Sequence, residues 1–110
     1  MSEELNNDQL HKVNGGANNA KHLINSINSL KSEFEYYCSC AKKELNYTII
    51  MSCLNAGIGY LKDNNFVSAK YHLEDSYQYI TKLASNRSEI FSYLNVFQTK
   101  VKNIADSIEI

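Results

Sequence analysis

Residues 90–108 read IFSYLNVFQTKVKNIADSI, and the apolar residues among them recur at alternating steps of four and three. The repeating positions are Ile90, Leu94, Phe97, Val101, Ile104 and Ile108. This spacing lines up one apolar stripe along a helix, so we predict an amphipathic helix over this stretch. Three heptads are short for a free coiled coil, so the stripe favours packing against other helices of the same chain.

The segment upstream of this helix contains two boundary signals and a second stripe. Asn86-Arg87-Ser88-Glu89 has the form of a capping box, in which Asn86 would be the N-cap and Glu89 would reach back to it. Lys62-Asp63-Asn64-Asn65 predicts a turn, because Asn and Asp can end one helix and cap the next. Between these signals we predict a helix whose stripe is Phe66, Ala69, Leu73, Tyr77, Ile80 and Leu83.

Residues 47–61 are apolar on most sides of the helix that their spacing predicts. A helix of this kind is usually the most buried one of a bundle. Its apolar residues are Ile49, Ile50, Met51, Cys53, Leu54, Ile58 and Leu61.

The small residues of this segment and of the next helix have spacings that resemble a single tetratricopeptide helix hairpin. The matching positions are Gly57, Tyr60, the turn at 63–65, Ala69 and Ser76. The proline usual in that family near position 81 is absent, and no second copy is evident, whereas a solenoid needs at least three repeats. We interpret the pair as antiparallel helices whose small residues permit close packing.

A further stripe starts after Asn18 or Asn19, either of which could cap a helix. Its apolar positions are Leu23, Ile27, Leu30, Phe34, Tyr37, Ala41 and Leu45. We expect a break or kink near Asn46, where the next apolar segment begins.

These stripes, in a chain without proline, predict an all-α fold. We expect a small antiparallel bundle of three to four helices, preceded by a flexible N-terminal leader. The expected core includes Ile50, Leu54, Leu73, Phe97, Val101 and Ile104.

The charge balance excludes several classes of partner. The 110 residues carry a formal charge of −1, and the first 16 hold three acidic residues and one lysine, so the remaining 94 carry +1. A nearly neutral chain lacks the basic surface that binds nucleic acid, so we expect no nucleic-acid partner. The most apolar segment, residues 47–61, is interrupted by Ser52, Asn55 and two glycines, so we expect no stable membrane span.

No signature of catalysis or of metal binding stands out. His11, His22 and His72 have no His or Cys partner at ligand spacing, and no serine or cysteine sits in a nucleophile motif. We therefore expect no enzyme, no cofactor and no metal site.

The chain has three cysteines, Cys38, Cys40 and Cys53. An odd number means that at least one thiol stays free or pairs between chains. Two interpretations remain open. The cysteines are small apolar core residues, or Cys38 or Cys40 forms a disulfide with Cys53 after export.

Residues 1–16 differ from the rest, because a few apolar residues precede two adjacent glycines. Leu5, Leu10 and Val13 fall within roughly 140° of one another on a helical wheel, and Gly15-Gly16 follow. Glycine can end a helix, and it offers a narrow protease cleft a chain without side chains.

This segment resembles the double-glycine leader of bacterial peptides exported by ABC transporters that carry a papain-like cysteine protease domain. In that family, apolar residues lie four, seven and twelve positions before the cut, an acidic or amide residue precedes the middle one, and Gly-Gly ends the leader. The matching residues here are Val13, Leu10, Leu5, Gln9 and Gly15-Gly16. Asn6 stands where the family often has Ser, and Gln9 where it often has Glu.

The resemblance implies that Leu5, Gln9, Leu10 and Val13 are recognised by the protease domain, and that the chain is cut between Gly16 and Ala17. It implies a bacteriocin-like or signalling precursor, made in a bacterial cytoplasm and secreted after the leader is removed. Residues 1–16 would be the leader and 17–110 a helical cargo. The peptidase-containing ABC transporter would be one partner, and a target-cell receptor or a cognate protein another.

A different interpretation treats residues 1–16 as a short amphipathic helix with a Gly-Gly cap. In another interpretation, residues 1–16 are a frayed N-terminal arm, and the chain is an intracellular helical interaction module, such as an immunity-type protein, whose hairpin groove binds a peptide or a helix. A neighbouring gene for a protease-containing ABC transporter favours export, and its absence favours the module.

Overall fold

The computed structural model describes the backbone of residues 7–110 and the side chains from Ala20 onward. This part of the chain forms four α-helices and two short 3₁₀ helices, and it contains no strand. The elements are α1 (Asn7–Tyr37), η1 (Ser39–Ala41), α2 (Leu45–Lys62), α3 (Phe66–Asn86), η2 (Ser88–Ile90) and α4 (Phe91–Ser107). The predicted all-α bundle is confirmed.

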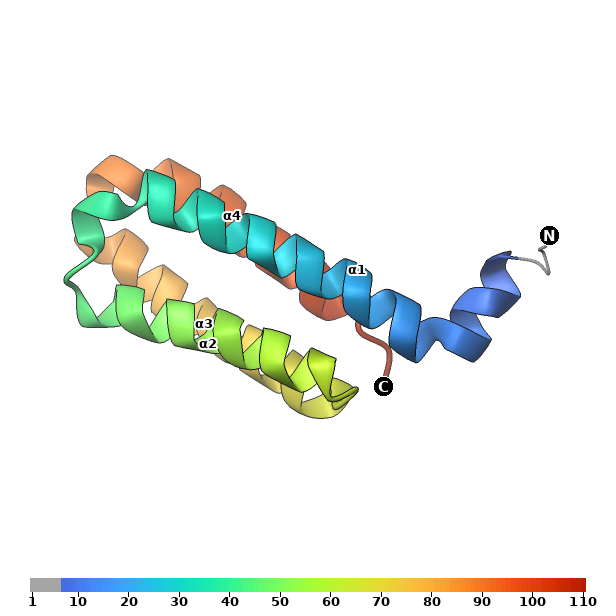
Figure 1. The fold of residues 1–110 in the computed structure, drawn as a ribbon. Helices are drawn as coiled ribbons and strands as arrows, with labels where there is room; N and C mark the ends of the chain where they lie inside the picture. Colours follow the sequence, from blue (N-terminus) through green and yellow to red (C-terminus); the bar gives the residue numbers. More distant parts are fainter. Residues whose placement is uncertain (1–6) are drawn as a thin grey trace.

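The four helices run alternately up and down, with the most extensive packing between α2 and α3, and α1 also lies beside α4 (Figure 1). Each helix also packs on the next one along the chain. The α1–α2 and α3–α4 connections lie together at one end, which we name the connection end. The α2–α3 turn and the C-terminus lie at the other end (Figure 1).

The core follows the predicted stripes closely. Ile50, Leu54, Leu73, Phe97 and Val101 are fully buried, while Ile104 is partly buried and packs against the core. Burying a side chain of this size stabilises a fold by about 1.5–3 kcal/mol. Helix α2 buries seven of its 18 residues, a larger share than α3 or α4.

Helix α1 begins at Asn7, so the predicted start at Asn18 or Asn19 is wrong. The helix passes through Gly15 and Gly16, which therefore do not end a helix. The physical reason is that glycine in a helix costs only about 1 kcal/mol relative to alanine, which neighbouring residues can outweigh.

The first helix ends at Tyr37, well before the predicted break near Asn46. A connection follows over residues 38–44, in which Ala41 is buried within a 3₁₀ turn. Because the α-helical spacing stops there, two stripe predictions are wrong: Tyr37 is 53% exposed and Leu45 is 73% exposed.

The predicted turn between α2 and α3 is confirmed, and its asparagines shape it. Asn65 is the N-cap of α3, and its side-chain oxygen accepts a hydrogen bond from the backbone N–H of Ser68 at 3.1 Å. Asn64 has a φ of 57°, in the left-handed region that Asn tolerates better than most residues.

The predicted capping box before the last helix is wrong. Asn86 is still part of α3, and no side chain caps α4, which begins at Phe91. Glu89 instead accepts a hydrogen bond from Arg87 at 3.2 Å. Arg87 also pairs with Glu44, 43 residues earlier, so this ion pair ties the two connections together at the connection end. Such a long-range partner leaves no sign in the local sequence pattern.

Candidate functional site

The predicted leader residues belong to the first part of α1. The backbone of Gln9, Leu10, Val13, Gly15, Gly16 and Ala17 is helical, but their side chains lie outside the described residues. Leu5 lies outside the described residues altogether.

The first part of α1 extends beyond the other helices. Helix α1 has 31 residues and α4 has 17, which at 1.5 Å per residue correspond to about 46 Å and about 26 Å. Because the two helices meet at the connection end, α1 continues past the other end of α4 (Figure 1). Gly16 lies six residues before His22, which faces the last turn of α4, so the Gly-Gly pair is about 9 Å past that level.

Buried side chains are described on all four helices, from Ala20 on α1 to Ala105 on α4 and Ile108 just after it. Ala20, with 6% of its surface exposed, and Leu23, with 5%, lie on the part of α1 whose side chains the structure describes, which starts at Ala20.

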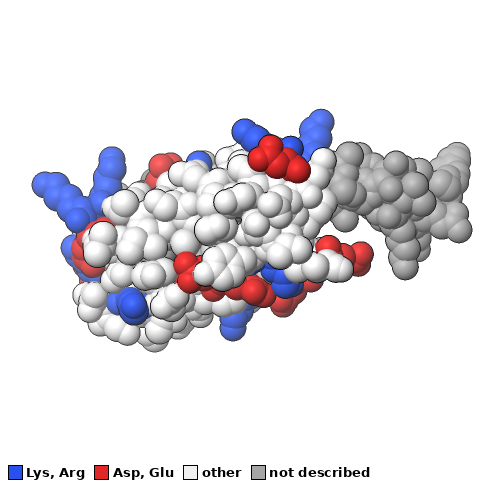
Figure 2. Space-filling model, turned by 90° about the horizontal axis from the view of Figure 1, so that it is seen from below, with Lys and Arg blue, Asp and Glu red and all other residues white. Residues whose placement is uncertain are grey.

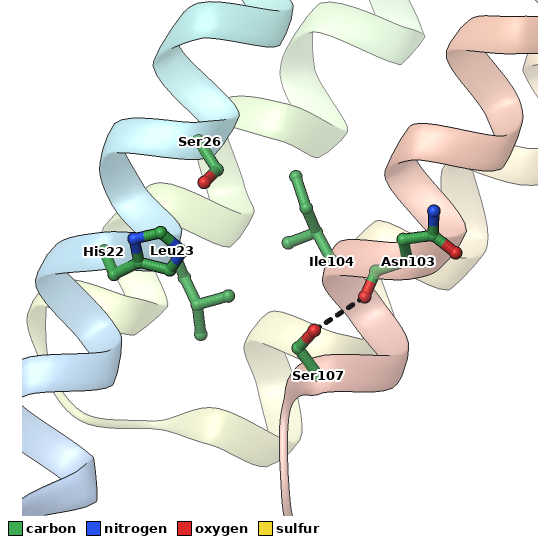
Figure 3. Close-up of a pocket in the computed structure, with 6 residues that line it drawn as sticks. All are labelled: His22, Leu23, Ser26, Asn103, Ile104 and Ser107. Carbon is green, nitrogen blue, oxygen red and sulfur yellow. Dashed lines mark hydrogen bonds between the residues drawn. The ribbon is translucent and has the colours of Figure 1, made fainter. Parts of the chain in front are cut away.

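A hollow of about 320 Å³ opens between α1 and α4, near the end of α4 (Figure 3). Its lining residues are His22, Leu23 and Ser26 from α1, and Asn103, Ile104 and Ser107 from α4. Ser26 and Ile104 face each other across the gap (Figure 3). A second hollow shares Ser26, Asn103 and Ile104 and continues to Lys100. Together they form one groove along the α1–α4 seam, lined by both polar and apolar side chains.

The groove contains hydroxyls and one imidazole, but not in a catalytic arrangement. A serine becomes a nucleophile when a base accepts its proton. The Ser107 hydroxyl instead donates to the backbone oxygen of Asn103 at 2.8 Å (Figure 3). The groove has room for a small group. Sequence reasoning missed it, because stripe spacing does not show which edges of two helices, about 80 residues apart, come together.

Closer to the connection end, polar contacts join α1 to α4 at Glu33. The Lys100 ammonium donates to Glu33 at 3.3 Å, and the Tyr93 hydroxyl donates to the same oxygen at 3.5 Å. Burial, and then the nearby Glu33 carboxylate, raise the pKa of Tyr93. The phenol therefore stays protonated and acts as a structural donor.

The three cysteines are free thiols with two kinds of surroundings. Cys38 and Cys53 are buried, whereas Cys40 is exposed on η1. Burial is the main cause that raises the pKa of Cys38 to about 12 and that of Cys53 to about 11. Both buried thiols therefore pack as small apolar groups. A bridge to Cys53 in an exported form stays a prediction.

In the part of the chain that the structure describes, no three His, Cys, Asp or Glu side chains gather as ligands for a metal ion. Nor does any helix there combine the length and the apolar character that crossing a lipid bilayer requires. The features that remain are the extended start of α1 and the surfaces of the bundle.

The chain matches no family model, no curated protein and no solved structure. Its function has therefore to be inferred from its own residues. The N-terminal motif is the feature that bears on it most directly.

Proposed function

We propose that this chain is the precursor of a secreted, bacteriocin-like or signalling helical protein, exported by a peptidase-containing ABC transporter. The observation that carries the proposal is the ordered N-terminal motif. Its residues are Leu5, Gln9, Leu10, Val13, Gly15 and Gly16. The transporter recognises this leader and cuts after Gly16, and residues 17–110 are the cargo. The chain is a substrate and not an enzyme.

The length of the proposed cargo supports this division. Ninety-four residues are enough to bury a modest core without disulfides or metal ions. We therefore expect residues 17–110 to keep a folded bundle after the leader has been removed.

The position of the glycines also supports it. A protease cleft binds an extended chain, so α1 has to unwind around the bond between Gly16 and Ala17 before it is cut. Each glycine weakens a helix by about 1 kcal/mol relative to alanine, which lowers the free energy of this local opening.

The test is processing of the full chain by a peptidase-containing transporter expressed in the same cell. We expect the medium to contain a product whose mass corresponds to a start at Ala17. Gly15→Ala and Gly16→Ala should block the cut, because each adds a side chain where the cleft closes. Gly59→Ala is the matched control: it changes an exposed helical glycine whose added Cβ would meet nothing within 4 Å, and it should be processed normally. Normal processing of both leader variants would overturn the proposal.

Docking of the leader can be tested in the same assay. Leu10→Asp would place a charge in an apolar pocket of the protease domain and should weaken binding about tenfold or more. Asn7→Asp, outside the arc that Leu5, Val13 and Leu10 span on the predicted leader helix, is the control. An equal loss with both variants would argue against a recognised apolar face.

A second candidate, an intracellular interaction module of the immunity type, is favoured by the packing of the α2–α3 hairpin. A Cβ built on Gly57 would lie 3.0 Å from Leu73 Cδ2, and Ala69 and Ser76 are fully buried. The small residues of the tetratricopeptide-like pattern thus lie where the two helices come closest. Intact full-length chain inside cells that express the transporter, with no product in the medium, would favour this candidate.

A further inference from the structure

The last two turns of α2 carry a shallow hollow on the outside of the bundle. Ala56, Gly59, Tyr60 and Asp63 line it, and its volume is about 380 Å³. These residues have the spacing i, i+3, i+4 and i+7, which places them on one side of a helix. The hollow therefore lies along the end of α2, next to the turn that leads into α3.

Gly59 has no packing role inside the bundle. A Cβ built on it would meet nothing within 4 Å, and its φ is not positive, so alanine would fit without strain. Alanine would also favour the helix more than glycine does. Gly57 differs, because a Cβ there would lie 3.0 Å from Leu73. The effect of the missing side chain at Gly59 is that the hollow stays open.

The charge at the hollow is negative. Helix α2 contains no Asp, Glu, Lys or Arg from Leu45 to Leu61. The side of the molecule formed by α2 and α3 shows a broad uncharged area, with charged side chains at its ends and along one edge (Figure 2). Asp63 lines the hollow and is the C-cap of α2, where the helix dipole adds negative potential.

No cation of the described part of the chain neutralises Asp63. None of the ion pairs between described residues includes it. Lys62 lies in the same turn, but it points about 100° away from Asp63 around the helix axis. Lys70 on α3 donates to the backbone oxygen of Ala105 on α4 at 2.8 Å. The Asp63 carboxylate is therefore available to a cation from outside the chain.

An aromatic ring lines the hollow beside this carboxylate. Tyr60 is 36% exposed, and its ring stacks on the imidazole of His72 with centroids 5.2 Å apart and planes 7° apart. His72 also meets the ring of Tyr71 edge-on at 5.2 Å. These contacts hold the Tyr60 ring in place before a ligand arrives, which lowers the entropy lost on binding. Aromatic rings attract cations to their faces.

We propose that this hollow binds a small organic cation whose nitrogen carries methyl groups, such as a quaternary ammonium ion. Asp63 supplies the counter-charge, the Tyr60 ring attracts the cation, and Ala56 and Gly59 contact the methyl groups. A divalent metal ion needs several oxygen ligands, whereas the hollow offers one carboxylate. A primary ammonium has three N–H donors, which the apolar part of the lining would leave without acceptors. The methylated cation therefore suits the lining better than either.

The test is a titration of the full, isotope-labelled chain with tetramethylammonium chloride at constant ionic strength, followed by the backbone amide signals in NMR spectra. Because the hollow is shallow, we expect a dissociation constant on the order of 1–10 mM. The saturable shifts should map to Gly59, Tyr60, Asp63 and His72. Potassium chloride should produce no saturable shift there. An equal response to both salts, or shifts that map elsewhere, overturns the proposal.

Two variants test the counter-charge and the ring. Asp63→Asn keeps the shape of the side chain and removes its charge, and it should weaken binding about fivefold. Tyr60→Leu removes the ring and should weaken binding by a similar factor. The matched control is Asp106→Asn, which removes an exposed carboxylate from the last turn of α4 and should leave the affinity unchanged. An unchanged affinity of Asp63→Asn would contradict the proposal.

A third variant tests the hollow itself. Gly59→Leu fills it with a side chain that favours the helix, and it leaves Asp63 and Tyr60 in place. Binding should be lost, and circular dichroism verifies that the variant is folded. Binding that survives in Gly59→Leu would overturn the proposal, because the cation would then be attracted by charge alone.

Vesicles separate two sources of the same chemical group. Choline presents it on a free molecule, and phosphatidylcholine presents it on a lipid surface. If phosphatidylcholine vesicles sediment with the chain and excess tetramethylammonium releases it, the ligand is a lipid headgroup. If choline binds and the chain stays in the supernatant of the vesicles, the ligand is a free cation. A chain that binds neither form overturns the proposal.

Discussion

The side chains of the α2–α3 interface and of the α1–α4 interface pack in different ways within one bundle. Between α2 and α3, small residues meet large ones, as where Leu73 fills the space that Gly57 leaves. Between α1 and α4, the rings of Phe34 and Phe97 meet near the connection end, with centroids 4.9 Å apart. Farther along the same seam, the groove at Ser26 leaves a space between the two helices.

The difference shows how side-chain size sets the distance between helices. Small residues allow two helices to approach closely along their length. Two large rings hold their helices apart, and the seam stays closed only while other large side chains continue to fill it. Where α1 and α4 offer Ser26 and Ser107 instead, the space is left as a hollow. Helices α2 and α3 therefore pack closely, whereas large side chains join α1 and α4 mainly near the connection end.

The largest effect is expected where the anchor of the α1–α4 pair is removed. Phe97→Ala deletes a fully buried ring and should lower the free energy of unfolding by about 3–5 kcal/mol. Urea denaturation followed by circular dichroism measures this loss. A loss below about 1 kcal/mol would mean that the rings do not hold this seam together.

The close approach of α2 and α3 can be broken by adding a side chain. Gly57→Leu forces new atoms against Leu73, which lies 3.0 Å from the position of a Cβ, and should cost about 1–3 kcal/mol. The same urea titration measures it. An unchanged midpoint would show that this interface has spare room, like the groove on the other side of the bundle.

A change two residues further on should have the opposite sign. Gly59→Ala puts a methyl group on the outer surface of α2, where nothing lies within 4 Å, and should stabilise the fold by up to about 1 kcal/mol. Thermal unfolding followed by circular dichroism measures the gain. Equal losses from the two glycine changes would contradict the distinction between an inward and an outward glycine on α2.

The smallest effect is expected from the ion pair between α1 and α4. The side chains of Glu33 and Lys100 are 36% and 47% exposed, so water and salt screen the pair. Glu33→Gln should change the free energy of unfolding by less than about 0.5 kcal/mol. A larger loss in the urea titration would show that this polar contact, together with Tyr93, does part of the anchoring assigned to the rings.

Much of the bundle was predictable from apolar spacing, because each helix buries one stripe. The stripe from Ile90 to Ile108 is buried except at Ile104, which is partly buried, and the turn before α3 is capped by Asn65. These features depend on residues close together in the sequence. Local spacing therefore contains most of the information needed to predict them.

The helix boundaries that were predicted wrongly depend on contacts with other parts of the molecule. Arg87 pairs with both Glu44 and Glu89, so the glutamate expected to cap a helix joins an ion pair between two connections. The spacing predicts that the apolar stripe continues to Leu45, but α1 ends at Tyr37. The groove likewise forms only because α1 and α4 lie side by side, and no local pattern predicts which helices become neighbours.

The unequal burial of the three thiols makes one of them a natural attachment point. The thiolate is the form that reacts, and burial keeps Cys38 and Cys53 protonated, whereas Cys40 is exposed to reagents. A maleimide dye will therefore label the native chain at one position without any mutation. That position lies at the connection end, and the extended start of α1 lies at the opposite end of the bundle (Figure 1). Fluorescence from Cys40 can follow residues 17–110 in the experiment that tests the proposed cut after Gly16.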